Sequence, residues 1–219
     1  MIRYTNIWHT TVQMLILILL SSVVLFGCGG AVAETSTVLE TDINVPIGRH
    51  IDPPQPLTDF TLTTHTNTSL SLSDLQGRVV LLYFGYTFCP DVCPATLADF
   101  VHVKRDLGDA AQNVAFVFVS VDGERDTPAV LAQYMLSFDP SFIGLQGDTQ
   151  TLRRISTDYG LIYERRKVAG TSAEYLVDHT AATYLIDTEG RLNVIYPFGT
   201  PPETISADIR ELLPAALQR

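Results

Sequence analysis

The 219-residue sequence predicts an α/β fold in which a mixed β-sheet is covered by helices on both faces. Three observations lead to this class. Continuous apolar runs indicate strands buried on both sides, segments with helical spacing separate them, and two short strands joined by a tight turn follow near the C-terminus. Hydrophobic residues make up 46% of the chain, which is close to the globular average, so one core of ordinary size can form.

The first regular elements follow Leu57. Two short stretches with alternating polar and apolar residues predict an N-terminal β-hairpin with its turn at 65–68, namely Thr58–Thr64 and Ser69–Leu72. Two continuous apolar runs then predict strands that are buried on both faces, Arg78–Tyr86 and Asn113–Val121.

Apolar spacing and capping residues predict four helices, which cover Pro94–Leu107, Thr127 to about Phe138, Thr149–Tyr159 and Pro201–Leu217. Two further strands precede the last helix and are joined by a hairpin turn over 188–191, namely Ala182–Asp187 and Leu192–Tyr196. This order of strands and helices is thioredoxin-like, and we assign it to one domain that covers residues 57–219.

The N-terminal segment 1–27 has the form of a signal peptide or a membrane anchor. Its only charged residue is Arg3, and the apolar run Met14–Phe26 is followed by small residues. The residues before Cys28 resemble a lipobox, the signal for cleavage and lipid attachment at a cysteine. An uncleaved anchor helix over 7–27 is the alternative, because about 20 apolar residues span a bilayer. Both interpretations tether the protein to a bacterial cell membrane and place the domain on the extracytoplasmic side.

Residues 28–56 are predicted to be a flexible linker. Small and polar residues come first, and the proline-rich stretch Asp52–Pro56 follows and favours extended backbone. The alternative is that part of this segment packs on the domain as an N-terminal strand.

The overall composition excludes several classes of protein. A formal net charge of −10 gives the chain no electrostatic footprint for nucleic acid. Three cysteines are too few for a disulfide-rich scaffold or for a zinc site with four cysteine ligands.

The most informative stretch is YFGYTFCPDVCP, which contains Cys89 and Cys93 where a buried strand gives way to a helix. Residues four apart lie on the same face of a helix, at a spacing that a disulfide can bridge. The positive end of the helix favours thiolates, and a pair of thiolates suits a soft cation such as Cu(I). An inert disulfide is the alternative, although so short a loop gains little stability from one.

Two thiolates alone leave a metal ion exposed, so a third ligand is needed, and imidazole suits copper. The candidates beyond the N-terminal segment are His50, His65, His102 and His179. His102 lies nine residues after Cys93 on the same predicted helix, too far along the helix axis to share a site. His179 directly precedes the strand that begins near Ala182, which in a thioredoxin-like sheet passes beside the cysteines. Position alone leaves its role open.

Three motifs together resemble the Sco/SenC family of copper metallochaperones: FGYTFCPDVCP, SVDGERDTPAVLAQYMLSFD, and DHT followed by ATYLIDTEG. The resemblance implies a membrane-tethered, thioredoxin-like protein that binds copper through Cys89, Cys93 and His179. Cu(I) is the expected ion, with Cu(II) as a further option. It also implies a role in delivering copper to, or preparing, the copper A site of cytochrome c oxidase subunit II. Other copper chaperones or thiol–disulfide oxidoreductases are further partners that we consider, and nucleic acid is not.

On this basis the protein is a metallochaperone rather than an enzyme. The alternative is a thiol–disulfide oxidoreductase whose redox-active pair is Cys89 and Cys93. Reductases with this fold normally have a proline that faces the cysteines, directly before the strand that corresponds to 182–187. This chain has Ala181 at that place, and the difference favours metal binding. The sequence departs from the family at Phe88, where a histidine is usual, and at Gly123, where a proline is usual.

Residues 160–178 are predicted to form a protruding hairpin next to His179. The segment contains Arg165, Arg166 and Lys167. This basic cluster either docks an acidic partner or forms part of a solvated loop.

Overall fold

The computed structural model of the chain describes residues 47–167 and 174–215. The described residues all belong to one compact unit of the chain. The predicted signal or anchor over 1–27, Cys28 and most of the predicted linker lie outside the described residues. Within the two described ranges, no helix has both the length and the apolar character needed to cross a membrane.

An eight-stranded mixed sheet forms the centre of the domain, with the strand order β1-β10-β9-β4-β5-β6-β2-β3. Its strands are β1 (Arg49–Pro56), β2 (Thr61–Thr64), β3 (Ser69–Ser71), β4 (Val79–Gly85), β5 (Val114–Ser120), β6 (Ile143–Gln146), β9 (Ala182–Ile186) and β10 (Arg191–Pro197). The two predicted apolar runs are the adjacent central strands β4 and β5, which pair in parallel and are buried at every residue. This explains why they lack polar residues at alternate positions.

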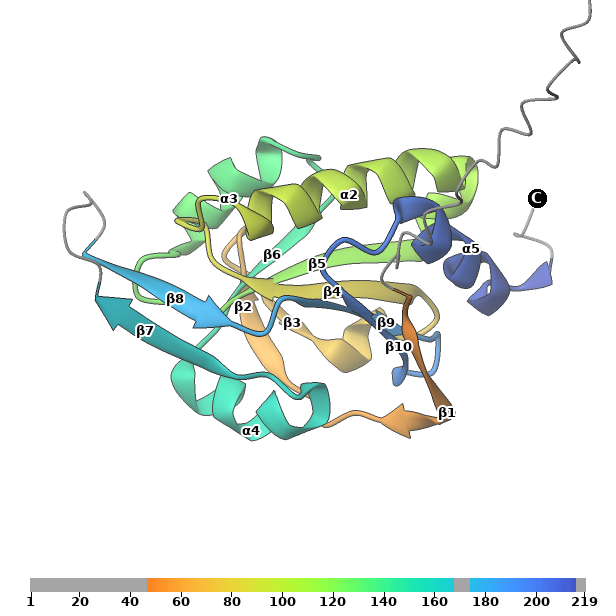
Figure 1. Ribbon diagram of the computed structural model, residues 1–219, viewed down its shortest axis with the longest axis horizontal. Coiled ribbons are helices and arrows are strands. Elements are labelled where there is room, and N and C mark those ends of the chain that lie inside the picture. The colour runs from red at the N-terminus through yellow and green to blue at the C-terminus, as the bar shows by residue number, and fades with distance from the viewer. Residues whose placement is uncertain (1–46, 168–173, 216–219) are drawn as a thin grey trace, which may run out of the picture. The chain divides into compact units, whose positions relative to one another are not determined.

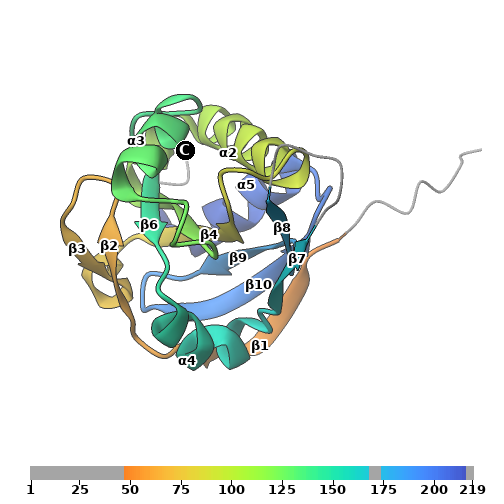
Figure 2. The same ribbon diagram turned by 90° about the vertical axis from the view of Figure 1, so that its left-hand side faces the viewer.

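The helices lie on both sides of this sheet (Figures 1 and 2). On one side are α2 (Val92–Leu107), α3 (Pro128–Leu136) and α5 (Pro202–Leu212), and on the other is α4 (Thr149–Tyr159). Short 3-10 helices cover Leu72–Leu75 and Gly108–Asn113. The prediction of an α/β, thioredoxin-like mixed sheet flanked by helices on both faces, with an N-terminal β-hairpin formed by β2 and β3, is confirmed.

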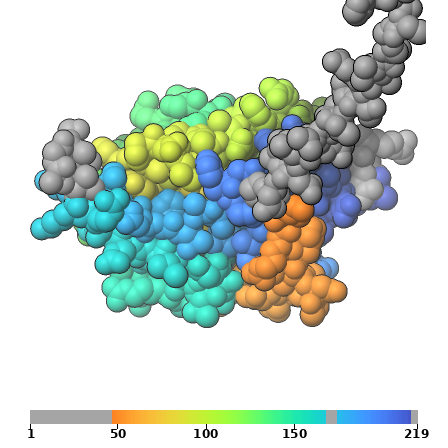
Figure 3. Space-filling model, in the orientation of Figure 1, coloured from red at the N-terminus to blue at the C-terminus, as the bar shows by residue number. Residues whose placement is uncertain are grey.

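A separate two-stranded sheet lies beside the large one. It is the hairpin of β7 (Tyr163–Lys167) and β8 (Tyr175–His179), which pair antiparallel. In the space-filling view the hairpin extends along one face of the domain below α2 (Figure 3). The predicted hairpin is therefore present, and its last residue is His179.

The predicted linker contains a strand that sequence reasoning gave only as an alternative. Residues Arg49–Pro56 form β1, which pairs antiparallel with β10 at the edge of the large sheet. Ordered structure therefore begins before Leu57. The register shifts between His50 and Gln55, so the adjacent prolines of this segment fall in the irregular part of the strand. An edge strand tolerates proline there, because the missing N–H group would not join a continuous ladder.

The structure also corrects two predicted helix boundaries, the end of one helix and the start of another. The last helix ends at Leu212 rather than at Leu217, because Leu213 has an extended backbone and Pro214 follows it. The first long helix begins at Val92, so Cys89 lies in the turn before the helix and not in its first turn.

Candidate metal centre

The two cysteines lie where β4 passes into α2. Cys93 is in the first turn of the helix and is fully buried, whereas Cys89 is half-buried in the preceding turn. The backbone N–H of Cys93 donates to Sγ of Cys89 at 3.5 Å. Cys89 therefore accepts a hydrogen bond at the helix N-terminus, where the backbone dipoles favour negative charge. Both cysteines are free thiols, so the pair is in its reduced form.

His179 reaches the cysteines from the end of β8. Its Nε2 atom lies 3.5 Å from Sγ of Cys93, and its Nδ1 atom lies 3.1 Å from the backbone carbonyl oxygen of Thr180. A carbonyl oxygen can only accept, so Nδ1 carries the proton in this bond. Nε2 is then the ring nitrogen that faces the cysteine sulfur, and it is the nitrogen that would bind a metal ion there.

Aromatic side chains enclose the sulfur and the imidazole. The hydroxyl group of buried Tyr83 donates to Sγ of Cys93 at 3.6 Å. The rings of Tyr83 and Tyr86 each contact the His179 ring edge-on, with centroids 5.9 Å apart. At Gly85 a Cβ atom would lie 2.7 Å from the Tyr83 ring and 3.0 Å from Sγ of Cys93. The glycine therefore allows the end of β4 to approach the sulfur closely.

The two thiols have opposite acidities. Hydrogen bonds from Cys93, from His179 and from backbone N–H groups lower the pKa of Cys89 to about 3, although burial opposes the shift. The hydrogen bond to Cys89 and burial raise the pKa of Cys93. Burial likewise raises the pKa of the Tyr83 hydroxyl, which therefore stays protonated as a donor. The pair thus shares one negative charge, which resides mainly on the more accessible sulfur of Cys89.

A buried carboxylate holds the turn that precedes Cys89. Asp126 accepts from the backbone N–H of Thr87 at 3.0 Å and from its hydroxyl at 2.6 Å. It also accepts from the Ser120 hydroxyl at 2.6 Å, and burial raises its pKa. Sequence reasoning assigned no role to Asp126. The available signal was its place in the SVDGERDTP motif, which lies after β5 and next to the end of β4.

The structure shows which of the four candidate histidines lies near the cysteines. His50 lies in β1, 3.9 Å from the carboxylate of Asp208, and Nδ1 of His65 accepts from the backbone N–H of Gly144 at 3.1 Å. His102 lies within α2. Of the histidines in the described ranges, His179 alone contacts a cysteine sulfur. The family resemblance selects the same residue, and its role as a metal ligand stays a prediction.

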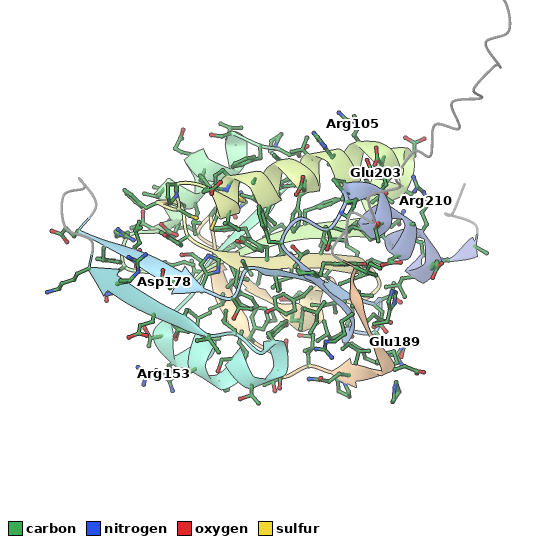
Figure 4. All side chains as sticks on the ribbon, viewed as in Figure 1. Arg105, Arg153, Asp178, Glu189, Glu203 and Arg210 are labelled. Carbon is green, nitrogen blue, oxygen red and sulfur yellow. The ribbon has the colours of Figure 1, made fainter. Side chains whose placement is uncertain are left out.

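The two arginines of the hairpin's basic cluster are paired with acidic side chains. Arg165 contacts Glu124 at 2.8 Å, and Arg166 contacts Asp178 at 2.8 Å. Figure 4 shows Asp178 on the hairpin, at the opposite end of the molecule from Arg105 and Arg210. Because nearby carboxylates neutralise these two arginines, the observed pairing favours the interpretation as a solvated loop over that as a docking site for an acidic partner.

The donor set has the chemistry of a site for a soft metal ion, since two sulfur atoms and one imidazole nitrogen suit copper. Within residues 47–167 and 174–215, no group of three or more His, Cys, Asp and Glu side chains is already arranged to hold a metal ion. Cys89, Cys93 and His179 therefore lie close together, and their side chains must still move to coordinate an ion.

The fold and the site together define the class of protein. It is a thioredoxin-fold protein in which a histidine faces a cysteine pair at the start of a helix. The family model described as SCO1/SenC matches residues 49–214, so the chain belongs to the SCO1/SenC family. The predicted family is thereby confirmed.

Relatives of known sequence and structure agree with this assignment. An SCO2-like protein of Rickettsia felis is 34% identical over 146 residues, which are 66% of this chain and 71% of that protein. The copper-bound structure of Bradyrhizobium japonicum ScoI is 37% identical, with a TM-score of 0.65 over 72% of this chain and 99% of that one. The apo Sco1 structure from Thermus thermophilus is 39% identical, with a TM-score of 0.67 over 76% of this chain and 96% of that one.

Proposed function

We propose that this protein binds copper on the extracytoplasmic side of a bacterial cell membrane and delivers it to, or prepares, the copper A site of cytochrome c oxidase subunit II. The observation that carries the proposal is the approach of His179 to Cys93 at 3.5 Å, next to a second cysteine at a helix N-terminus. The copper-bound ScoI of Bradyrhizobium japonicum is a solved relative at 37% identity and supports the choice of ion.

In this proposal the ligands of Cu(I) are Sγ of Cys89, Sγ of Cys93 and Nε2 of His179. The low pKa of Cys89 supplies one thiolate before the ion arrives, and binding displaces the proton of Cys93. Cu(II) is a second form that the same three ligands could accept, because imidazole and thiolate both bind it.

The geometry also suggests a direction for the release of the cargo. Cys93 is buried against Tyr83, whereas Cys89 is half-buried in the turn before α2. A thiolate of an incoming partner therefore meets the ion from the side of Cys89. We propose that ligand exchange begins there, with the cysteines of the oxidase subunit as the receiving thiolates.

The partner and the location follow from the family resemblance and from the sequence of the N-terminal segment. Subunit II is the partner that the resemblance implies, and other copper chaperones or thiol–disulfide oxidoreductases would supply copper or electrons. A lipid on Cys28 or an anchor helix within 1–27 would tether the domain to the membrane.

Cu(I) titration of the reduced protein tests the ligand set. We expect the wild type to bind one Cu(I), and we expect His179→Ala to bind it more weakly while the circular dichroism spectrum stays unchanged. His102→Ala is the matched control, because that histidine lies within α2 and should leave the affinity unchanged. Equal affinities of the wild type and His179→Ala would contradict the ligand role of His179. Transfer of copper to an isolated subunit II domain then tests the delivery step.

A thiol–disulfide oxidoreductase is the second candidate. The contrast between an accessible Cys89 of low pKa and a buried Cys93 of raised pKa favours it, because attacking and resolving thiols differ in this way. Ala181 precedes β9 in place of the proline that such reductases carry. Rapid reduction of insulin disulfides that persists in His179→Ala would favour this candidate over copper delivery.

A further inference from the structure

The turn that carries Cys89 and the strand that carries His179 are joined by the side chain of Arg125. Its guanidinium carbon lies 3.7 Å from the centroid of the Tyr175 ring and 4.8 Å from that of Phe88. Phe88 directly precedes Cys89, and Tyr175 is the first residue of β8, which ends at His179. Because a guanidinium is attracted to aromatic faces, Arg125 holds these two segments together.

Hydrogen bonds fix the guanidinium in this place. Its Nε atom donates to the carboxylate of Asp122, and its Nη1 atom donates to the backbone carbonyl of Tyr175 at 3.0 Å. Asp122 is fully buried and also accepts from the Tyr175 hydroxyl at 2.8 Å and from Arg165 at 3.3 Å. Arg165 lies on β7, so both strands of the hairpin are tied to the loop that follows β5.

These ties matter because the hairpin belongs to a sheet of its own. In the part of the chain that the structure describes, β7 and β8 pair with each other and not with the eight-stranded sheet. Ladder hydrogen bonds therefore do not fix the position of His179 relative to β4 and α2, which carry or contact the cysteines. His179 is joined to β9 through Thr180 and Ala181, and its ring packs against Tyr83 and Tyr86. Side-chain contacts with the 121–126 loop hold the rest of the hairpin against the domain and so contribute to the placement of His179.

We propose that Arg125 is a positioning residue that sets the separation between the His179 imidazole and the cysteine pair. The proposal rests on the copper-binding function proposed above and deepens it. Arg125 does not touch the ion. It acts through Tyr175 on one side and through Phe88 on the other.

A double-mutant cycle tests this role. Cu(I) affinities are measured by competition with a chelator for the wild type, Arg125→Met, His179→Ala and the double variant. We expect Arg125→Met to weaken binding roughly 10- to 100-fold when His179 is present, as other positioning partners of metal ligands do. It should have no effect when His179 is absent, because there is then no imidazole to position.

Equal losses in both backgrounds, or no loss in the presence of His179, would overturn the proposal. A His179→Ala variant that binds as tightly as the wild type would overturn it together with the proposed ligand set, so the two failures are distinguishable. Arg166→Met is the matched control, since this arginine of the same hairpin pairs with exposed Asp178. It should leave the affinity unchanged.

A second variant keeps the test decisive if Arg125→Met folds poorly, and a measurement on the metal-free protein adds a readout that does not use copper. Phe88→Ala removes one aromatic contact and leaves the Asp122 hydrogen bonds in place, so it should give a smaller loss with the same dependence on His179. In the metal-free protein, hydrogen exchange should become faster in β7 and β8 of Arg125→Met but not in α2. Unchanged exchange in the hairpin would overturn the proposal without any use of copper.

Discussion

The Nε2 atom of His179 lies 3.5 Å from Sγ of Cys93, although 86 positions separate the two residues in the chain. The contact joins the end of hairpin β7–β8 to the first turn of α2. Tyr83 of β4 contacts both partners, because its hydroxyl donates to the sulfur and its ring packs edge-on against the imidazole. Three separate elements therefore meet at one sulfur atom, and the state of that sulfur depends on all of them.

Replacement of Tyr83 by phenylalanine should make the cysteine pair easier to oxidise. The change removes the donor to Sγ of Cys93 but keeps the ring in place. A hydrogen bond of this kind contributes about 1 kcal/mol, and losing it destabilises the reduced form relative to the disulfide. We expect the midpoint potential of the pair to fall by up to about 20 mV, measured by equilibration with a thiol–disulfide buffer.

Tyr184→Phe is the matched control for this experiment. The Tyr184 hydroxyl is buried on β9 and has no hydrogen-bond partner among the residues that the structure describes. Removal of an unsatisfied buried hydroxyl is neutral or stabilising, and it should leave the potential unchanged. If both variants had the wild-type potential, the bond from Tyr83 to Cys93 would have no influence on the redox state.

Most of the sheet and its helices could be predicted from the sequence, because their signals are local. The apolar runs of β4 and β5 and the cap of α3, where Thr127 accepts from the backbone N–H of Val130, are each visible within a short window. Strand β1 was predicted as linker, since Pro53 and Pro54 resemble a spacer. Only pairing with β10, more than a hundred positions later, makes it a strand.

The site was predictable in part for the same reason. Cys89 and Cys93 are neighbours in sequence, so their spacing alone indicated reactive or metal-binding chemistry. The place of His179 depends on how hairpin β7–β8 folds back, and only the family resemblance identified it. Arg125 and Asp126 were missed as supports of the site, because a charged residue in a loop has no sequence pattern that reveals which side chain it will meet.

The acidity of Cys89 leads to a prediction about alkylation. Its pKa of about 3 lies far below the ordinary cysteine value near 8.5, so this thiol is ionised throughout the neutral range. We expect iodoacetamide to modify Cys89 of the reduced, metal-free protein at a rate that is nearly independent of pH between about 5 and 8. Cys93, which is buried and has a raised pKa, should not react until the protein unfolds.

The same shift has a consequence for stability. A group whose pKa is lowered in the folded state stabilises the protein fully above its unfolded pKa, and this contribution declines as the pH falls toward the folded value. The wild type should therefore lose more stability than Cys89→Ser between about pH 8 and pH 4, as measured by urea denaturation. Parallel losses in the two proteins, or alkylation that increases tenfold per pH unit, would show that Cys89 has an ordinary pKa.

The N-terminal segment leads to a prediction about location. We expect the full chain expressed in a bacterium to fractionate with membranes, and a chain that begins at residue 47 to be released in soluble form. The mass of the mature N-terminus then decides the type of tether. A chain that begins at Cys28 and carries added lipid mass indicates a lipoprotein, and an intact segment 1–27 indicates an anchor helix. Recovery of the full chain in the soluble fraction would contradict both.

Replacement of Asp126 by alanine should destabilise the protein through the turn that precedes Cys89. The carboxylate accepts from Ser120 and twice from Thr87, so its loss leaves buried donors without a partner. Each such donor costs about 1–3 kcal/mol, and we expect the free energy of unfolding to fall by about that amount or more. Urea denaturation of the reduced protein measures it.

Asp91→Ala is the control, because Asp91 precedes α2 but its side chain makes no capping hydrogen bond. Its removal should change the free energy of unfolding by less than about 0.5 kcal/mol. Since Thr87 lies two positions before Cys89, Asp126→Ala should also move the thiol away from the helix N-terminus and raise its pKa, which the alkylation rate reports. An Asp126→Ala variant as stable as the control, with an unchanged alkylation profile, would show that the cysteine turn keeps its conformation without the buried carboxylate.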